Sequence, residues 1–210
     1  MELASVVAVS GFLAEATAWW AVRARAAPLW RLLPGVLVAM ALAAVLARPP
    51  VAAADVRVGL AFGVGVASGV LLYVATRLFV AVAARSSFFR RATVDIYAEA
   101  APIPIGLAIA LSVAVMVPSE ELFWRGLVQP HLDDLAGPTA AAIVTWVAFT
   151  AVNVPSRSVP IVLGAAVGGA LWAALAWWSG GMLASLASHI LWTGLMLALP
   201  PAPGREVVGP

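Results

Sequence analysis

Residues 118–126 read PSEELFWRG and place two adjacent carboxylates and one arginine within a mostly apolar stretch. Glu121 and Arg125 are four residues apart, so they share one helical face and can form an ion pair. Glu120 is rotated about 100° from Glu121 around the helix axis, which leaves it without an evident partner on its own face. A carboxylate in a low-dielectric pocket can act as a general base toward a bound water.

Two further polar pairs follow at the same spacing. Asn153 comes four residues after Phe149 in FTAVN, and Thr193 comes four residues after His189 in HILWT. A lone intramembrane histidine or asparagine is usually a helix–helix hydrogen-bonding residue. A glutamate, an amide and an imidazole on three successive helices instead favour one shared polar site. There the imidazole and amide could hold water and stabilise an oxyanion, which suits hydrolysis of an amide bond.

A purely structural interpretation of the first motif is also open. Pro118 and Ser119 form a helix start signal, with Ser119 as the predicted N-cap. Glu120 and Glu121 would then occupy the first turn, where carboxylates complement the helix dipole. In this interpretation the motif is a cap with an ion pair, and its presence alone does not predict catalysis.

The elements that position these residues follow from composition. Of 210 residues, 63% are hydrophobic and 10% are charged, and the mean hydropathy is +1.02. These values indicate a polytopic membrane protein, and spanning backbone must satisfy its own hydrogen bonds, so we expect an all-α transmembrane bundle of about seven or eight membrane helices. The arginines flank apolar segments, which favours membrane orientation over nucleic-acid binding. With no cysteine, disulfides, thiolate ligands and a cysteine nucleophile are excluded.

Apolar runs predict spans at 3–22, 32–47, 58–84, 101–117, 138–153, 160–178 and 181–199, with a shorter helix at 119–132. Residues 1–199 form one predicted membrane domain, and 200–210 a flexible tail rich in proline and glycine. Residues 86–100 are either an interfacial segment or a solvated loop with anchoring aromatics. The spacings Gly65–Gly69 and Gly164–Gly168 predict close helix packing.

Arginines also predict orientation. The first connection holds Arg23, Arg25 and Arg31, and a second group, Arg85, Arg90 and Arg91, follows the third span. Both groups fall on one side of the membrane, which the positive-inside rule makes cytoplasmic. Arg48 and Arg57, which flank the second connection, argue the other way.

Taken together, EELFWRG at 120–126, Phe149-x-x-x-Asn153 and His189-x-x-x-Thr193 resemble the CPBP family of intramembrane proteases. This family includes the type II CAAX prenyl proteases and bacteriocin-immunity (Abi-like) relatives, and its pattern is EExxxR, FxxxH and HxxxN or HxxxD. The resemblance covers about residues 100–199, the predicted catalytic core. It implies that Glu120 is the general base, that Glu121 and Arg125 are an orienting pair, and that His189 is a motif histidine.

Two positions depart from the family pattern. Asn153 stands where the second motif has histidine, and Thr193 where the third has asparagine or aspartate. Asparagine cannot act as a base near neutral pH and is a poor transition-metal ligand. Catalytic zinc needs roughly three protein ligands, so the divalent metal that the resemblance implies is disfavoured, with Glu120 and His189 as weak candidate ligands. No other cofactor is predicted, and the second histidine, His131, is expected at the membrane interface.

The leading hypothesis is an intramembrane endopeptidase in a bacterial cytoplasmic membrane. Its expected partners are membrane lipid and a membrane-associated peptide or protein substrate, with no nucleic acid, and the oligomeric state is open. The alternative is a catalytically degenerate relative that acts as a membrane binding or immunity protein. A small transporter is a third hypothesis, based on Glu15 and Arg77 within spans.

Overall fold

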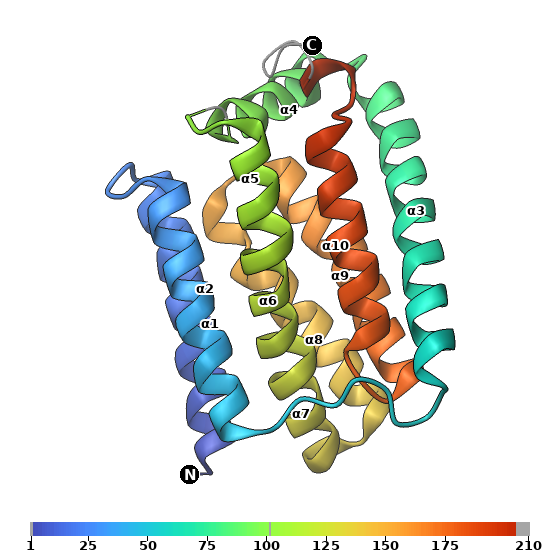
Figure 1. Cartoon of the computed structure of the whole chain (residues 1–210). Coiled ribbons are helices and arrows are strands. Elements are labelled where there is room, and N and C mark those ends of the chain that lie inside the picture. Colours follow the sequence, from blue (N-terminus) through green and yellow to red (C-terminus); the bar gives the residue numbers. More distant parts are fainter. Residues whose placement is uncertain (1, 101, 205–210) are drawn as a thin grey trace.

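The computed structural model describes residues 2–100 and 102–204, and within these ranges the elements are helices joined by short connections (Figure 1). Six helical segments are long and apolar enough to cross a membrane, and a shorter apolar helix follows them. The prediction of a polytopic helical bundle is confirmed. The α-helices are α1 (Leu3–Arg23), α2 (Leu29–Ala47), α3 (Val58–Ala83), α4 (Ser87–Ala100), α5 (Ile105–Leu111), α6 (Val117–Phe123), α7 (Gln129–Ala136), α8 (Pro138–Val152), α9 (Val159–Ser179) and α10 (Leu183–Ala198).

The predicted helix start at Ser119 is wrong. Helices α5, α6 and α7 form one continuous helix over Ile105–Ala136, joined by the π-helical turns η1 (Ser112–Met116) and η2 (Trp124–Val128). Ser119 is buried and makes no side-chain cap. The motif carboxylates therefore lie in mid-span, without the helix-terminus stabilisation that the sequence suggested.

Wide turns explain how the helix continues through its prolines. Pro118 and Pro130 each follow a π-helical turn, and a proline ring in a regular helix clashes with the carbonyl four residues before it. At the first turn the Val117 N–H donates to the Ser112 carbonyl, five residues back, and at the second the Gln129 N–H donates to the Trp124 carbonyl. Such widened turns relieve the clash and often occur at functional sites.

Helix α10, which carries His189, packs closely on α3. A Cβ on Gly65 would lie 2.4 Å from the Ala184 carbonyl oxygen, and one on Gly69 would lie 2.7 Å from that of Ser188. Both contacts are with backbone, so the two helices approach closely because these positions are glycine. The packing role predicted for this pair of glycines is confirmed.

Connections close the two ends of the bundle differently. The α1–α2 loop and α4 lie at the same end, as the arginine pattern predicted, and α4 crosses that end as a helix with Tyr97 donating to the Met196 carbonyl at 2.8 Å (Figure 1). At the opposite end, the 48–57 connection receives backbone hydrogen bonds from Met182 and Leu183. Residues 205–210, most of the predicted flexible tail, lie outside the described residues.

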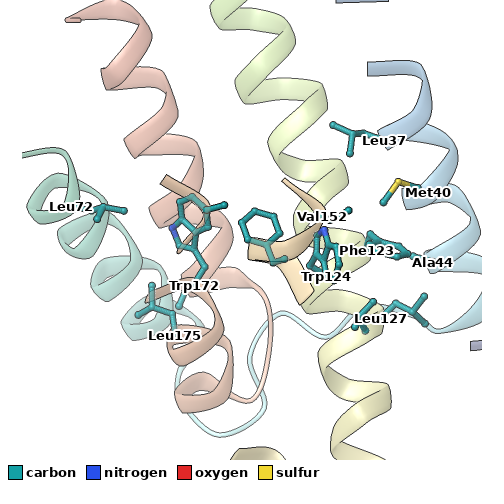
Figure 2. Close-up of a cluster of buried hydrophobic side chains, with 14 of the residues drawn as sticks. Leu37, Met40, Ala44, Leu72, Phe123, Trp124, Leu127, Val152, Trp172 and Leu175 are labelled. Atoms are coloured by element: carbon teal, nitrogen blue, oxygen red, sulfur yellow. The ribbon is translucent and has the colours of Figure 1, made fainter. Parts of the chain in front are cut away.

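An aromatic core fills the centre of the bundle. Figure 2 shows Trp124 and Trp172 among the buried side chains, Trp124 from η2 and Trp172 from α9. Phe149 of α8 contacts both rings edge-on, with centroids 5.7 Å from Trp124 and 6.1 Å from Trp172. These rings form the rigid apolar wall against which the polar side chains of the motifs lie.

Candidate active site

Glu121 is the centre of the polar cluster. Its Oε1 accepts a hydrogen bond from Arg125 Nη1 at 3.1 Å and another from His189 Nδ1 at 2.9 Å. The side chains of Glu121 and Arg125 are both fully buried. The i, i+4 ion pair predicted from sequence is present. The same carboxylate also links this helix to α10 through His189, 68 residues further along the chain.

The Glu121 contact determines which nitrogen of His189 carries the proton. An ionised carboxylate only accepts hydrogen bonds, so Nδ1 is the donor, and in the neutral ring Nε2 is left with a lone pair. Nε2 faces Glu120, whose Oε2 lies 3.8 Å away. This separation is beyond direct hydrogen-bond distance, and polar groups so placed are commonly bridged by water.

The two glutamates differ in their access to solvent. The Glu120 side chain is 15% exposed, whereas that of Glu121 is 0% exposed. Although adjacent in sequence, they approach the two nitrogens of one imidazole, Glu121 at Nδ1 and Glu120 at Nε2. Glu120 is thus the carboxylate that can meet a water, and Glu121 is the one that holds the histidine.

Aromatic rings hold both Arg125 and His189 in place. The Arg125 guanidinium carbon lies 4.6 Å from the Phe149 ring centroid, and its Nη2 donates to the Gly169 carbonyl at 3.3 Å. Trp172 stacks on His189 with centroids 3.5 Å apart and an interplanar angle of 18°. The phenylalanine of the second motif therefore covers the arginine of the first through a cation–π contact.

The two departing positions are less integrated into this cluster. Asn153 is buried at the end of α8, and its Nδ2 donates to the Phe149 carbonyl of its own helix at 2.9 Å. Thr193 is half-buried, and its hydroxyl makes no side-chain hydrogen bond with another described residue. Glu120, Glu121, Arg125 and His189 form the connected group.

Glu15 of α1 is a further acidic side chain near the cluster, which the motif spacing did not reveal. It is fully buried and its Oε2 accepts a hydrogen bond from Trp124 Nε1 at 3.1 Å, while its Oε1 has no partner among the described residues. It interacts electrostatically with Glu120. Only its position in the sequence indicated a role, because it is a lone acid within the first apolar span. A charged side chain there costs about 3 kcal/mol or more unless it faces polar groups.

The remaining polar residues of the spans serve packing contacts. His131, expected at the membrane interface, is buried in α7, with its Nε2 2.9 Å from the Ser5 hydroxyl near the start of α1. Arg77 donates to the Tyr73 hydroxyl at 2.9 Å, and Tyr73 in turn donates to the Leu199 carbonyl at 3.0 Å. These contacts join α1 to α7 and α3 to the end of α10.

The residues around Glu120 do not fit a catalytic zinc centre. Such a centre uses three protein ligands of the histidine, cysteine or carboxylate type. Within the described ranges no group of three such residues is arranged to hold a metal ion. Glu121 is already engaged by Arg125 and His189, and Asn153 occupies the position at which the family pattern has a second histidine.

Comparison with known proteins agrees with the family resemblance predicted from the motifs. Residues 101–195 match the family model described as type II CAAX prenyl endopeptidase Rce1-like. No curated protein and no solved structure matches the chain. The matched segment includes all seven motif positions, and the predicted resemblance to the CPBP intramembrane proteases is confirmed. Glu15 lies outside this segment.

Proposed function

We propose, from the Rce1-like character of its C-terminal half, that this integral multi-pass membrane protein is an intramembrane endopeptidase. One observation carries the proposal: the partly exposed Glu120 carboxylate faces the proton-accepting nitrogen of an imidazole that Glu121 and Trp172 hold in place. A carboxylate base beside an oriented hydrogen-bond acceptor can activate a water between them.

In the proposed reaction Glu120 takes a proton from water while the resulting hydroxide attacks the carbonyl carbon of the peptide bond. His189 Nε2 accepts a hydrogen bond from the attacking water and orients it. The tetrahedral intermediate then collapses, the C–N bond breaks, and the leaving amine takes the proton from Glu120. Asn153 is proposed to hold the water or the oxyanion, with Thr193 as a hydrogen-bonding replacement for the asparagine of the third motif.

Arg125 and Glu121 have a positioning role in this mechanism. Arg125 pairs with Glu121, Glu121 orients His189 through Nδ1, and the Trp172 stack fixes the plane of the ring. No step requires a metal ion. The substrate class is a membrane-associated peptide or protein, the surrounding partner is lipid, and the proposed location is a bacterial cytoplasmic membrane.

One observation favours a catalytically degenerate relative that binds a membrane partner. Asn153 donates to its own helix backbone and replaces a residue that could accept a proton. The Glu121, Arg125 and His189 network also satisfies charges in the bundle core, so it has structural value without chemistry.

Peptide cleavage by the purified protein in lipid nanodiscs separates the two functions. The probes are a farnesylated CAAX peptide and an unprenylated peptide with a membrane anchor, each with a fluorophore and quencher on opposite sides of the scissile bond. The protease predicts cleavage that Glu120→Gln reduces at least about 100-fold, on the scale of a lost general base. Glu99→Gln, the same change on α4, is the matched control and keeps activity.

Asn153→His supplies the second measurement. If it raises the cleavage rate at least tenfold, the native chain is a weakened protease. If neither the native protein nor this variant cleaves any probe, while a membrane peptide binds with equal affinity to native and Glu120→Gln protein, the binding function replaces the proposal.

A further inference from the structure

Three arginines from two distant parts of the chain line one surface pocket. Arg23 is the last residue of α1, Arg25 follows two positions later, and Arg157 follows the 3-10 turn η3 (Val154–Ser156) after α8. Together with Trp20 and Ala24 they enclose a cavity of about 300 Å³. The α1–α2 loop that contributes to it lies at the end of the bundle crossed by α4 (Figure 1). Folding thus assembles a basic pocket that no single motif in the sequence contains.

Two of these arginines adopt a backbone conformation that favours glycine. Arg25 has φ of 57° and Arg157 has φ of 52°, and among the described residues they are the non-glycine positions with positive φ. Glycine is the usual residue at such a helix end, because a Cβ disfavours the left-handed backbone conformation. The chain contains 17 glycines, yet both turns use arginine and both arginines line the same pocket. Residues held in a disfavoured backbone conformation cluster at functional sites.

The guanidinium groups in this pocket are available to a ligand. Arg23, Arg25 and Arg157 are exposed, and none forms an ion pair or side-chain hydrogen bond with another described residue. The acid close enough to interact with Arg23 is Glu99 of α4. Burial raises the pKa of Glu99, an effect that Arg23 opposes and Asp95 reinforces. Three cations against one neighbouring carboxylate leave the pocket positive.

The chemistry of the lining selects a phosphate group. Arginine presents planar paired N–H donors that match phosphate oxygens, and clustered arginines are the usual phosphate-binding arrangement. Trp20 is 58% exposed beside them, and exposed tryptophan near the end of a span typically lies among lipid headgroups. The cavity volume is at the lower limit for ligand pockets, which suits a headgroup better than a large soluble molecule.

We propose that the pocket formed by Arg23, Arg25 and Arg157 binds the phosphate of an anionic phospholipid headgroup, seated beside Trp20. The site is separate from the carboxylate and histidine cluster, so the proposal does not depend on protease activity. Free inorganic phosphate shares the same chemistry, and the test distinguishes the two sources.

The test measures lipid binding to the detergent-purified full chain by native mass spectrometry and by thermal stability. The native protein is expected to bind phosphatidylglycerol at least tenfold more tightly than phosphatidylcholine and to be stabilised by it. Arg25→Gly with Arg157→Gly removes two charges and relieves both positive φ values, so this double variant folds at least as well in neutral lipid. It is expected to lose the preference for phosphatidylglycerol.

A matched control removes two charges elsewhere. The double variant Arg31→Gln and Arg91→Gln changes residues outside the pocket lining. It is expected to keep the preference for phosphatidylglycerol. Equal binding of both lipids by the native protein, or an unchanged preference in the glycine variant, would overturn the proposal. If millimolar inorganic phosphate stabilises the native protein as strongly as phosphatidylglycerol does, the pocket binds a free anion and the headgroup assignment is wrong.

Discussion

The buried Glu121–Arg125 pair is expected to contribute far more to stability than a surface ion pair of the same chain. At 3.1 Å and an effective dielectric constant of about 20, the Coulomb attraction between the two charges is about 5 kcal/mol before desolvation. Removing one partner leaves the other charge at 0% exposure, which costs about 3–5 kcal/mol. Glu121→Gln and Arg125→Gln should each show a loss of this size.

A double-mutant cycle isolates the interaction itself. The single variants Glu121→Gln and Arg125→Gln and their combination are unfolded with denaturing detergent in mixed micelles, and the fluorescence of the nine tryptophans is followed. The coupling energy is expected to reach at least about 2 kcal/mol, because each single change strands a buried charge that the double change removes. Arg125→Lys, which keeps the charge without the paired donors, should fall between native and Arg125→Gln.

The matched control for this cycle is the Arg48–Asp134 pair, whose side chains are 33% and 59% exposed. Exposed pairs contribute about 0.2–1 kcal/mol, so Arg48→Gln and Asp134→Asn should couple within that range. If the buried pair couples no more strongly than this control, the reasoning is refuted, and Arg125 would be held by its Phe149 contact and not by its pairing with Glu121.

Three further outcomes are expected in the same unfolding assay. Gly65→Ala should destabilise by about 1–3 kcal/mol through its backbone clash with α10, whereas Gly63→Ala, which meets nothing within 4 Å, should be neutral or slightly stabilising. Glu15→Gln keeps an acceptor for the Trp124 indole N–H and should be tolerated better than Glu15→Leu, by about 1–3 kcal/mol. Tyr97→Phe should lose about 1 kcal/mol with its carbonyl hydrogen bond. Since burial raises the pKa of Tyr97, the native phenol should ionise at a higher pH than free tyrosine. The free energy of unfolding should therefore fall as pH rises from the unfolded pKa to the folded pKa of Tyr97.

Local spacing predicted the parts of the site that one helix or one packing motif encodes. Glu121 and Arg125 pair because residues four apart share a face, whether the turn is regular or slightly widened. Gly65 and Gly69 pack because small residues at that spacing expose backbone. Neither inference required knowledge of which other helix lies opposite.

The break predicted before Ser119 failed because proline signals act through local backbone geometry, which π-helical turns can absorb. A proline followed by serine usually marks a helix start, yet the preceding turn widens here and the helix continues. A membrane favours continuation, because a true helix end in mid-span would expose backbone groups to hydrocarbon. The capping interpretation of Glu120 and Glu121 fails for the same reason.

Apart from the shared glutamate and histidine site, contacts between distant helices were not predictable from the sequence. Trp172 stacks on His189 from a different helix, and Glu15 reaches Trp124 across 109 positions of sequence. No periodicity encodes such pairings, because they depend on which helix faces arrive side by side. The unusual residue alone, an acid in an apolar span, indicated that Glu15 needed a polar neighbour.

The packing of α10 on α3 has a consequence for biosynthesis. The 16-residue α10 begins about one hundred residues after α3 ends, and it docks on glycines of that earlier helix. Until it docks, the translated chain already contains Glu120, Glu121 and Arg125 but has no imidazole to complete them. The polar cluster is therefore incomplete until α10 has been synthesised and has docked on α3.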